Sequence, residues 1–315
     1  MNARGATIGV WIGSVIVALA LAVGCASPTR VEPRPDAELA QYIASAQNAF
    51  RLNSFERAAR FYELALQRAR AIDDSQEVGK QAYNLAAALL LAERPADALP
   101  YLTEAEASFQ QVRRDRGPVL LLRARALRAA GQVDAARAEV QKVVELKTAD
   151  EIHCQGWLLF GQMAYEAKDE AEAAKALSRA RSFVTPDPAL RAGVAALAGR
   201  VALLKDRADD AGLEFDKETE LFRQAGRFRD MAESLQRAAE AYVKAGDAAL
   251  AGQRYYRAAR SWLGLGEPVR ALKTMESALG AIGSEDDAVW GPEMAALFEE
   301  IRNTPVAGTR TEKLE

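Results

Sequence analysis

The sequence predicts an all-α fold, an α-solenoid of about six to seven helix pairs closed by a capping helix at its C-terminal end. Six alanines lie 37 to 40 residues apart along the chain: Ala58, Ala98, Ala136, Ala173, Ala211 and Ala251. A small residue precedes each of them by twelve positions: Ala46, Ala86, Ala124, Gly161, Gly199 and Ala239. A fixed period of this length is typical of stacked helical hairpins. We expect the two small residues of each unit to meet where its helices cross.

The first unit shows the pattern most simply. Tyr42, Ala46 and Ala49 would form one face of its first helix. Their spacing of three and four residues is that of an amphipathic helix. Asn53 and Ser54 favour a turn. The inner face of the second helix is then expected to hold Phe55, Ala58, Ala59, Tyr62, Ala65 and Leu66.

The later units repeat this scheme as far as Ala258. Pro95 would open the second helix of its unit, where its missing N–H has no intrahelical partner to lose. Ala271 follows Ala251 by only 20 residues, so a helix over about 249–265 is expected to pack on both sides. Pro292 would open the last amphipathic helix. A terminal helix of this kind covers the apolar face that the last repeat would otherwise expose.

The units resemble the tetratricopeptide repeat over roughly residues 37–281. Bulky and small residues follow the order of that family most closely in the fourth unit: Trp157, Gly161, Ala173, Leu177 and Ala180. Glu218 departs from it, because the family has a small residue at that place. The resemblance implies a right-handed superhelix whose concave surface binds other proteins.

The N-terminal segment reads as a targeting signal. Arg4 precedes an uncharged apolar run over residues 8–23, the layout of a secretory signal peptide. Ala22-Val23-Gly24-Cys25 resembles a bacterial lipobox, although Ala22 stands where leucine is usual. The resemblance implies a cleaved signal peptide over residues 1–24 and a lipidated Cys25. An uncleaved membrane anchor and ordinary secretion are the alternatives.

The expected domain organisation follows from these segments. Residues 25–36 contain three prolines and would form an extended tether. The solenoid with its cap would occupy residues 37–303, and the polar residues 304–315 a disordered tail. The resemblance to lipoproteins implies a lipid-anchored protein of the bacterial cell envelope, at the outer membrane and facing the periplasm. The sequence leaves the inner membrane open.

The composition argues against several other classes of function. The net charge is −3 and no basic block occurs, which argues against nucleic-acid binding. The chain has one histidine, His153, and its only cysteine besides Cys25 is Cys154. A zinc site needs three or four ligands, and no phosphate-binding loop or nucleophile elbow occurs. We expect no enzymatic activity, no metal and no cofactor.

The resemblance also indicates which side chains would line the concave groove. Carried over from the family, the groove positions are Gln47, Phe50, Arg51, Lys80, Tyr83, Leu121, Arg125, Arg128, Gln155, Gln162, Tyr165 and Arg200. Aromatic and basic side chains are mixed in this set. It therefore suggests a peptide partner with acidic side chains, and solvated arginines with no partner are the alternative reading.

The predicted function is that of a membrane-anchored scaffold for protein–protein interactions in the assembly of the cell envelope or of a secretion complex. A self-associating structural spacer of an envelope machine is the alternative. A ligand-binding or enzymatic helical domain is a third possibility. The sequence leaves the partner's identity and the oligomeric state open.

Overall fold

The structure, a computed structural model, describes residues 36–183, 185–282 and 291–304. The predictions for the signal peptide, for Cys25 and for most of the tether lie outside the described residues, as does nearly all of the tail. Within the described ranges, no helix is both long enough and apolar enough to cross a bilayer.

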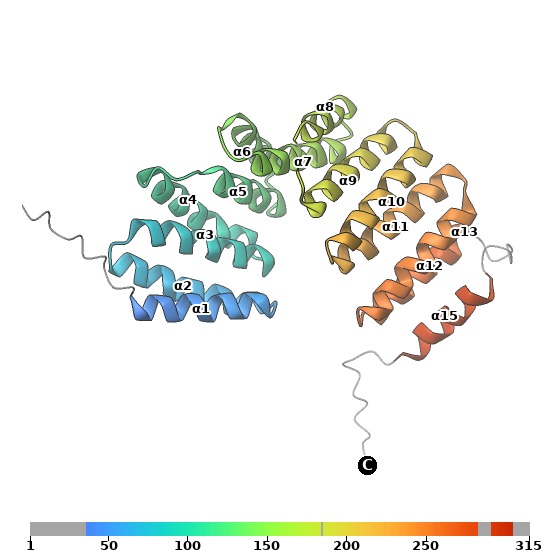
Figure 1. The fold of residues 1–315 in the computed structure, drawn as a ribbon, viewed down its shortest axis with the longest axis horizontal. Coiled ribbons are helices and arrows are strands. Elements are labelled where there is room, and N and C mark those ends of the chain that lie inside the picture. Colours follow the sequence, from blue (N-terminus) through green and yellow to red (C-terminus); the bar gives the residue numbers. More distant parts are fainter. Residues whose placement is uncertain (1–35, 184, 283–290, 305–315) are drawn as a thin grey trace, which may run out of the picture. The chain divides into compact units, whose positions relative to one another are not determined.

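All regular structure in the described ranges is helical, which confirms the all-α prediction (Figure 1). The first seven helices are α1 (Ala37–Arg51), α2 (Phe55–Ala71), α3 (Ser75–Leu91), α4 (Pro95–Gln111), α5 (Gly117–Ala129), α6 (Val133–Glu145) and α7 (Asp150–Glu166). The others are α8 (Glu170–Arg181), α9 (Pro188–Leu204), α10 (Ala208–Gln224), α11 (Phe228–Ala245), α12 (Ala248–Gly264), α13 (Pro268–Ile282) and α15 (Pro292–Asn303).

Each helix packs mainly against the one before it and the one after it, in consecutive pairs as in a tetratricopeptide-like solenoid. The first helices of neighbouring pairs also touch, as α5 does α7 and as α7 does α9. All six repeating alanines are fully buried between helices. A methyl group at these places lets the helix axes approach closely, which explains why small residues recur there.

The glycines of the repeat correct the expectation that small residues meet each other. A Cβ on Gly199 would lie 2.6 Å from Cε1 of Phe215, so a phenyl ring fills the space beside this glycine. A Cβ on Gly161 would lie 2.5 Å from Leu197 and 3.0 Å from Ala176. The expectation is therefore wrong for Gly199, whose missing side chain makes room for a bulky one.

Most of the connections between helices share one backbone conformation. Ten of those in the described ranges contain a residue with positive φ: Asn53, Asp73, Glu93, Arg113, Gly131, Lys168, Asp206, Gly226, Gly246 and Gly266. The next residue donates its N–H to the carbonyl five positions back, as Asp169 does to Ala164 at 2.8 Å. This is the hydrogen bond of the Schellman motif. It ends each of the ten helices that precede these residues and reverses the chain within a few residues.

The C-terminal end agrees with the predicted cap. Helix α12 packs against both α11 and α13, and α15 packs against α13 and α12. Met294 and Leu297 of α15 are buried in one cluster with Trp262 and Met275. The last helix therefore covers the apolar face of α13.

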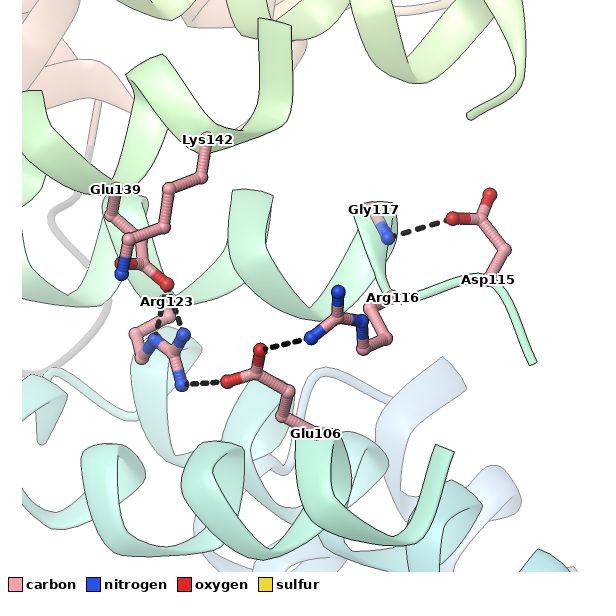
Figure 2. A network of polar contacts seen from close by, with 7 residues as sticks. All are labelled: Glu106, Asp115, Arg116, Gly117, Arg123, Glu139 and Lys142. Carbon is pink, nitrogen blue, oxygen red and sulfur yellow. Dashed lines mark hydrogen bonds and ion pairs between the residues drawn. The ribbon is translucent and has the colours of Figure 1, made fainter. Parts of the chain in front are cut away.

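A polar network joins α4, α5 and α6 (Figure 2). Arg123 of α5 lies between Glu106 of α4, at 2.7 Å, and Glu139 of α6, and Glu139 also accepts from Lys142 at 2.8 Å. Burial lowers the pKa of Arg123, but the hydrogen bonds to both carboxylates outweigh this and the pKa is raised. Because both carboxylates hold the same guanidinium, the network fixes α5 against its two neighbours.

Candidate ligand-binding cavity

A cavity of about 720 Å³ lies among α5, α7, α9, α10 and α11. Helix α9 contributes the most lining residues, and α5, α7 and α11 are likewise first helices of their pairs. Five of the residues predicted to line a groove surround this cavity: Arg125, Arg128, Gln155, Gln162 and Arg200.

Apolar side chains supply part of the cavity lining. Leu158 and Leu159 come from α7, Leu190 and Leu197 from α9, and Phe222 from α10. Polar and charged groups supply the rest. More than half of the lining residues are polar or charged, so this cavity is more polar than a usual small-molecule site.

Arg125 has a neutral partner. Its Nη2 donates to Oε1 of Gln155 at 3.0 Å, and no carboxylate of the described residues forms an ion pair with it. Solvent reaches the side chain, but the protein surrounds it on several sides. This loss of water lowers the pKa of Arg125, and the charge of Arg128 adds to the effect.

Arg128 differs from Arg125 because its charge is compensated. Its Nη1 lies 2.7 Å from Oε1 of Glu166. Gln162 donates to the same carboxylate oxygen at 3.1 Å. Arg128 and Gln162 thus hold one carboxylate of α7 at the edge of the cavity.

Glu218, the residue at which the tetratricopeptide pattern failed, is part of the cavity wall. It is 2 % exposed, and Arg237 of α11 donates to its two oxygens at 2.7 and 3.3 Å. Burial raises the pKa of Glu218, and the charge of Arg237 opposes that shift only in part. The carboxylate therefore binds α10 to α11 in place of a small residue.

Arg200 faces this pair from α9. Burial lowers the pKa of Arg200, and the neighbouring charge of Arg237 lowers it further, whereas Glu218 acts in the opposite direction. No carboxylate in the described part of the chain lies within ion-pair distance of Arg200. Arg125 and Arg200 are thus the two cavity arginines without a carboxylate partner.

Two predicted aromatic residues lie near these arginines. Tyr165 lines a smaller pocket of about 170 Å³, which shares Arg200 and Arg237 with the cavity. Burial raises the pKa of Tyr83, and the charge of Arg125 opposes this shift. Tyr83 therefore lies close enough to Arg125 to be influenced by its charge.

The remaining predicted groove residues do not line this cavity. Gln47 and Arg51 are exposed on α1, and Phe50 packs edge-on against Phe55 with ring centres 5.4 Å apart. Lys80 forms an ion pair with Glu77 of its own helix at 2.6 Å. Leu121 is 3 % exposed and belongs to the core, so it offers no surface to a ligand.

Sequence reasoning missed Glu233, Arg237 and Lys244, all on α11. The helix positions that gave Gln155 and Arg51 correspond in the sixth unit to Glu233 and Lys244, so the signal was present for these two. Arg237 lies at another position of the repeat. It enters the cavity because of how α11 packs on α10.

His153 and Cys154 do not form a catalytic pair. Nε2 of His153 lies 2.6 Å from the carbonyl oxygen of Leu146, and Sγ of Cys154 lies 3.7 Å from that of Ala180. Burial raises the pKa of Cys154 to about 11, so this thiol stays protonated at neutral pH. No group of three or more potential metal ligands occurs in the described residues.

No family model matches the chain, and no curated protein does either. Among solved structures, a tetratricopeptide repeat protein from Parabacteroides merdae ATCC 43184 is similar over 84 % of this chain and 99 % of that one, with 13 % identity and a TM-score of 0.49. A chain of the APC/C hetero-tetramer Cut9–Hcn1 is similar over 84 % of this chain and 52 % of its own length, with 13 % identity and a TM-score of 0.49. This chain therefore spans about half the length of that relative.

A Rap protein complexed with Competence and Sporulation Factor is also similar, over 84 % of this chain and 74 % of that one, with 12 % identity and a TM-score of 0.39. At such identities the similarity concerns the helical architecture alone.

Proposed function

We propose that this protein is a scaffold for protein–protein interactions that binds an acidic segment of another protein in the cavity among α5, α7, α9 and α11. The observation that carries the proposal is the pair of arginines without carboxylate partners. Arg125, which is exposed, and Arg200, which is half-buried, both line the cavity. A carboxylate from a partner would compensate a charge that the protein itself leaves uncompensated.

The expected gain comes from charge-assisted hydrogen bonds. An arginine offers a planar fork of donors that fits a carboxylate in a bidentate way. Such a bond contributes about 1.5–3 kcal/mol, and less at Arg125, because solvent reaches this side chain. The leucines of the cavity wall would add the burial of apolar side chains of the same segment.

The volume also suits part of a polypeptide. A cavity of about 720 Å³ lies within the range of roughly 300–1,000 Å³ that is common for ligand sites. It would hold a few side chains of a bound segment, with the rest of the segment running over neighbouring helices.

A binding assay with peptides tests the proposal. A library of peptides that differ in acidic content is titrated against the full chain, its Arg125→Glu variant and an Arg60→Glu control, in which an exposed arginine of α2 is reversed instead. We expect acidic peptides to bind best, with affinity that falls as salt rises. Arg125→Glu should abolish this preference and Arg60→Glu should retain it. Equal binding to all three proteins would contradict the proposal.

We also propose that the scaffold is anchored in the bacterial envelope by acyl chains on Cys25 and contributes to assembly of the envelope or of a secretion complex. The support is the apolar N-terminal run followed by Ala22-Val23-Gly24-Cys25. Two or more acyl chains are enough for stable membrane attachment. Mass spectrometry of the processed N-terminus should show an acylated Cys25, and an unmodified sulfur there would contradict the anchor.

A further inference from the structure

A second, smaller pocket adjoins the cavity and carries more positive than negative charge. It has a volume of about 170 Å³ and is lined from α7, α9, α10 and α11. Three cations and one carboxylate line it: Arg200, Arg237, Lys244 and Glu240. Tyr165 and Phe215 also line it. The phenol of Tyr165 can donate a further hydrogen bond.

Only one of the three cations has a close anionic partner among the described residues. Arg237 holds the buried carboxylate of Glu218. Neither Arg200 nor Lys244 forms an ion pair with a described carboxylate. With Glu218 and Glu240 both counted, the three cations leave one positive charge in excess at this pocket, because Glu166, whose charge also acts on Arg200, is paired with Arg128.

We infer that the pocket lined by Tyr165, Arg200, Arg237 and Lys244 is a seat for one oxyanion, a carboxylate or a phosphate group. This inference rests on the proposed function, because the protein segment bound in the adjoining cavity would carry the oxyanion. A guanidinium, an ammonium and a phenol that line one small pocket offer several donors to it. Such a set suits the several acceptor oxygens of an oxyanion.

The size of the pocket limits the occupant. A space of about 170 Å³ is small beside the roughly 300–1,000 Å³ of common ligand sites, which favours a single charged group. The ring of Phe215 and the side chain of Leu203 form an apolar part of the wall. The methylene groups of an acidic side chain, or the carbon atoms that bear a phosphoryl group, would lie against these two residues.

The lowered pKa of Arg200 agrees with this inference. Its charge is held where water is displaced and Arg237 is near. Binding of an anion would relieve both effects. Removal of Arg237 is unsuitable as a test, because it would leave the buried carboxylate of Glu218 unpaired.

Titration of the full chain with small anions tests the seat directly. Inorganic phosphate and acetate are added separately, each against chloride at equal ionic strength, and binding is followed by NMR of the anion. We expect at least one of the two to bind more tightly than chloride. Arg200→Gln and Lys244→Gln should each weaken it by about tenfold, since each removes a charge-assisted hydrogen bond.

Two exposed residues outside the pocket provide controls, Arg60 of α2 and Lys273 of α13. Their replacement by glutamine should leave anion binding unchanged, and circular dichroism checks that every variant is folded. Tighter binding of phosphate would indicate a phosphorylated segment, and tighter binding of acetate an acidic one. Both results support the seat.

Binding no tighter than that of chloride, or an equal loss in the control variants, would overturn the inference. Failure of the seat is distinguishable from failure of the scaffold function. Peptide binding that depends on Arg125, without specific binding of phosphate or acetate, would remove the seat and leave the scaffold.

Discussion

At the scale of single residues, the sequence located the buried small positions but not their neighbours. The six repeating alanines are all buried, as their spacing indicated. The partner of Gly199 is Phe215, which lies 16 residues further along the chain and not at a small position. Spacing determines the face of a helix on which a residue lies. It does not determine which side chain of the next helix reaches that face.

Gly199→Ala should destabilise the protein by about 1–3 kcal/mol. The added Cβ would lie 2.6 Å from a ring that is itself 2 % exposed and has little room to move. Chemical denaturation measures the change. Gly280→Ala in α13 is the matched control, because nothing lies within 4 Å of its Cβ, and it should stabilise by about 0.5–1 kcal/mol. Similar effects of the two substitutions would contradict the packing described.

Glu218 predicts a pH dependence of stability. Its pKa in the folded protein is raised, chiefly by burial, so the folded state holds this proton more tightly than the unfolded chain does. The stability that it contributes is therefore fully present below the unfolded pKa of about 4.3 and is lost as the pH rises through the folded value.

Glu218→Gln removes this titration. The free energy of unfolding of the wild type relative to this variant should fall as the pH rises above about 4.3 and then level off. Denaturation at a series of pH values measures it, and Glu63→Gln, at an exposed residue of α2, should show no such fall. If this difference in the free energy of unfolding rose with pH instead, the charge of Arg237 would lower the pKa of Glu218 by more than burial raises it.

At the scale of the elements, helix boundaries follow from turn chemistry that the sequence shows only in part. Gly131 and Gly246 indicate a residue in the left-handed region, and both have positive φ. Glu93 and Lys168 adopt the same conformation without being glycine. No local signal marks them, because the three-residue connection imposes the conformation once both helices are packed.

Lys168→Gly should stabilise the protein by about 1 kcal/mol, because a side chain at φ 56° is strained and glycine is not. The gain appears as a higher denaturation midpoint. The reverse test is Gly246→Ala. No atom would obstruct the new Cβ, so the backbone strain alone should lower the free energy of unfolding by a similar amount. If both variants were as stable as the wild type, the connections would not hold these residues in the left-handed region.

At the scale of the whole molecule, the sequence repeat predicts the helix pairs, but it predicts only some of the residues that line the cavity. The same repeat position yields Arg125, Gln162 and Arg200, and Gln155 lies two turns before Gln162; all four line one cavity. Arg237 was not predictable in this way, because it is placed by the packing of α11 on α10. The sequence also does not show which arginine has an anionic partner. Arg128 pairs with a carboxylate, whereas the partner of Arg125 is a neutral amide.

Site-specific photo-cross-linking in living cells shows directly which segment of a partner occupies the cavity. A photoreactive residue replaces Ala129, an exposed alanine of α5 that lines the cavity, or Ala138, an exposed alanine of α6 that does not. We expect an adduct from position 129 whose captured segment is acidic, and whose yield falls in the Arg125→Glu background. Equal adducts from positions 129 and 138, or a captured segment without acidic residues, would contradict it.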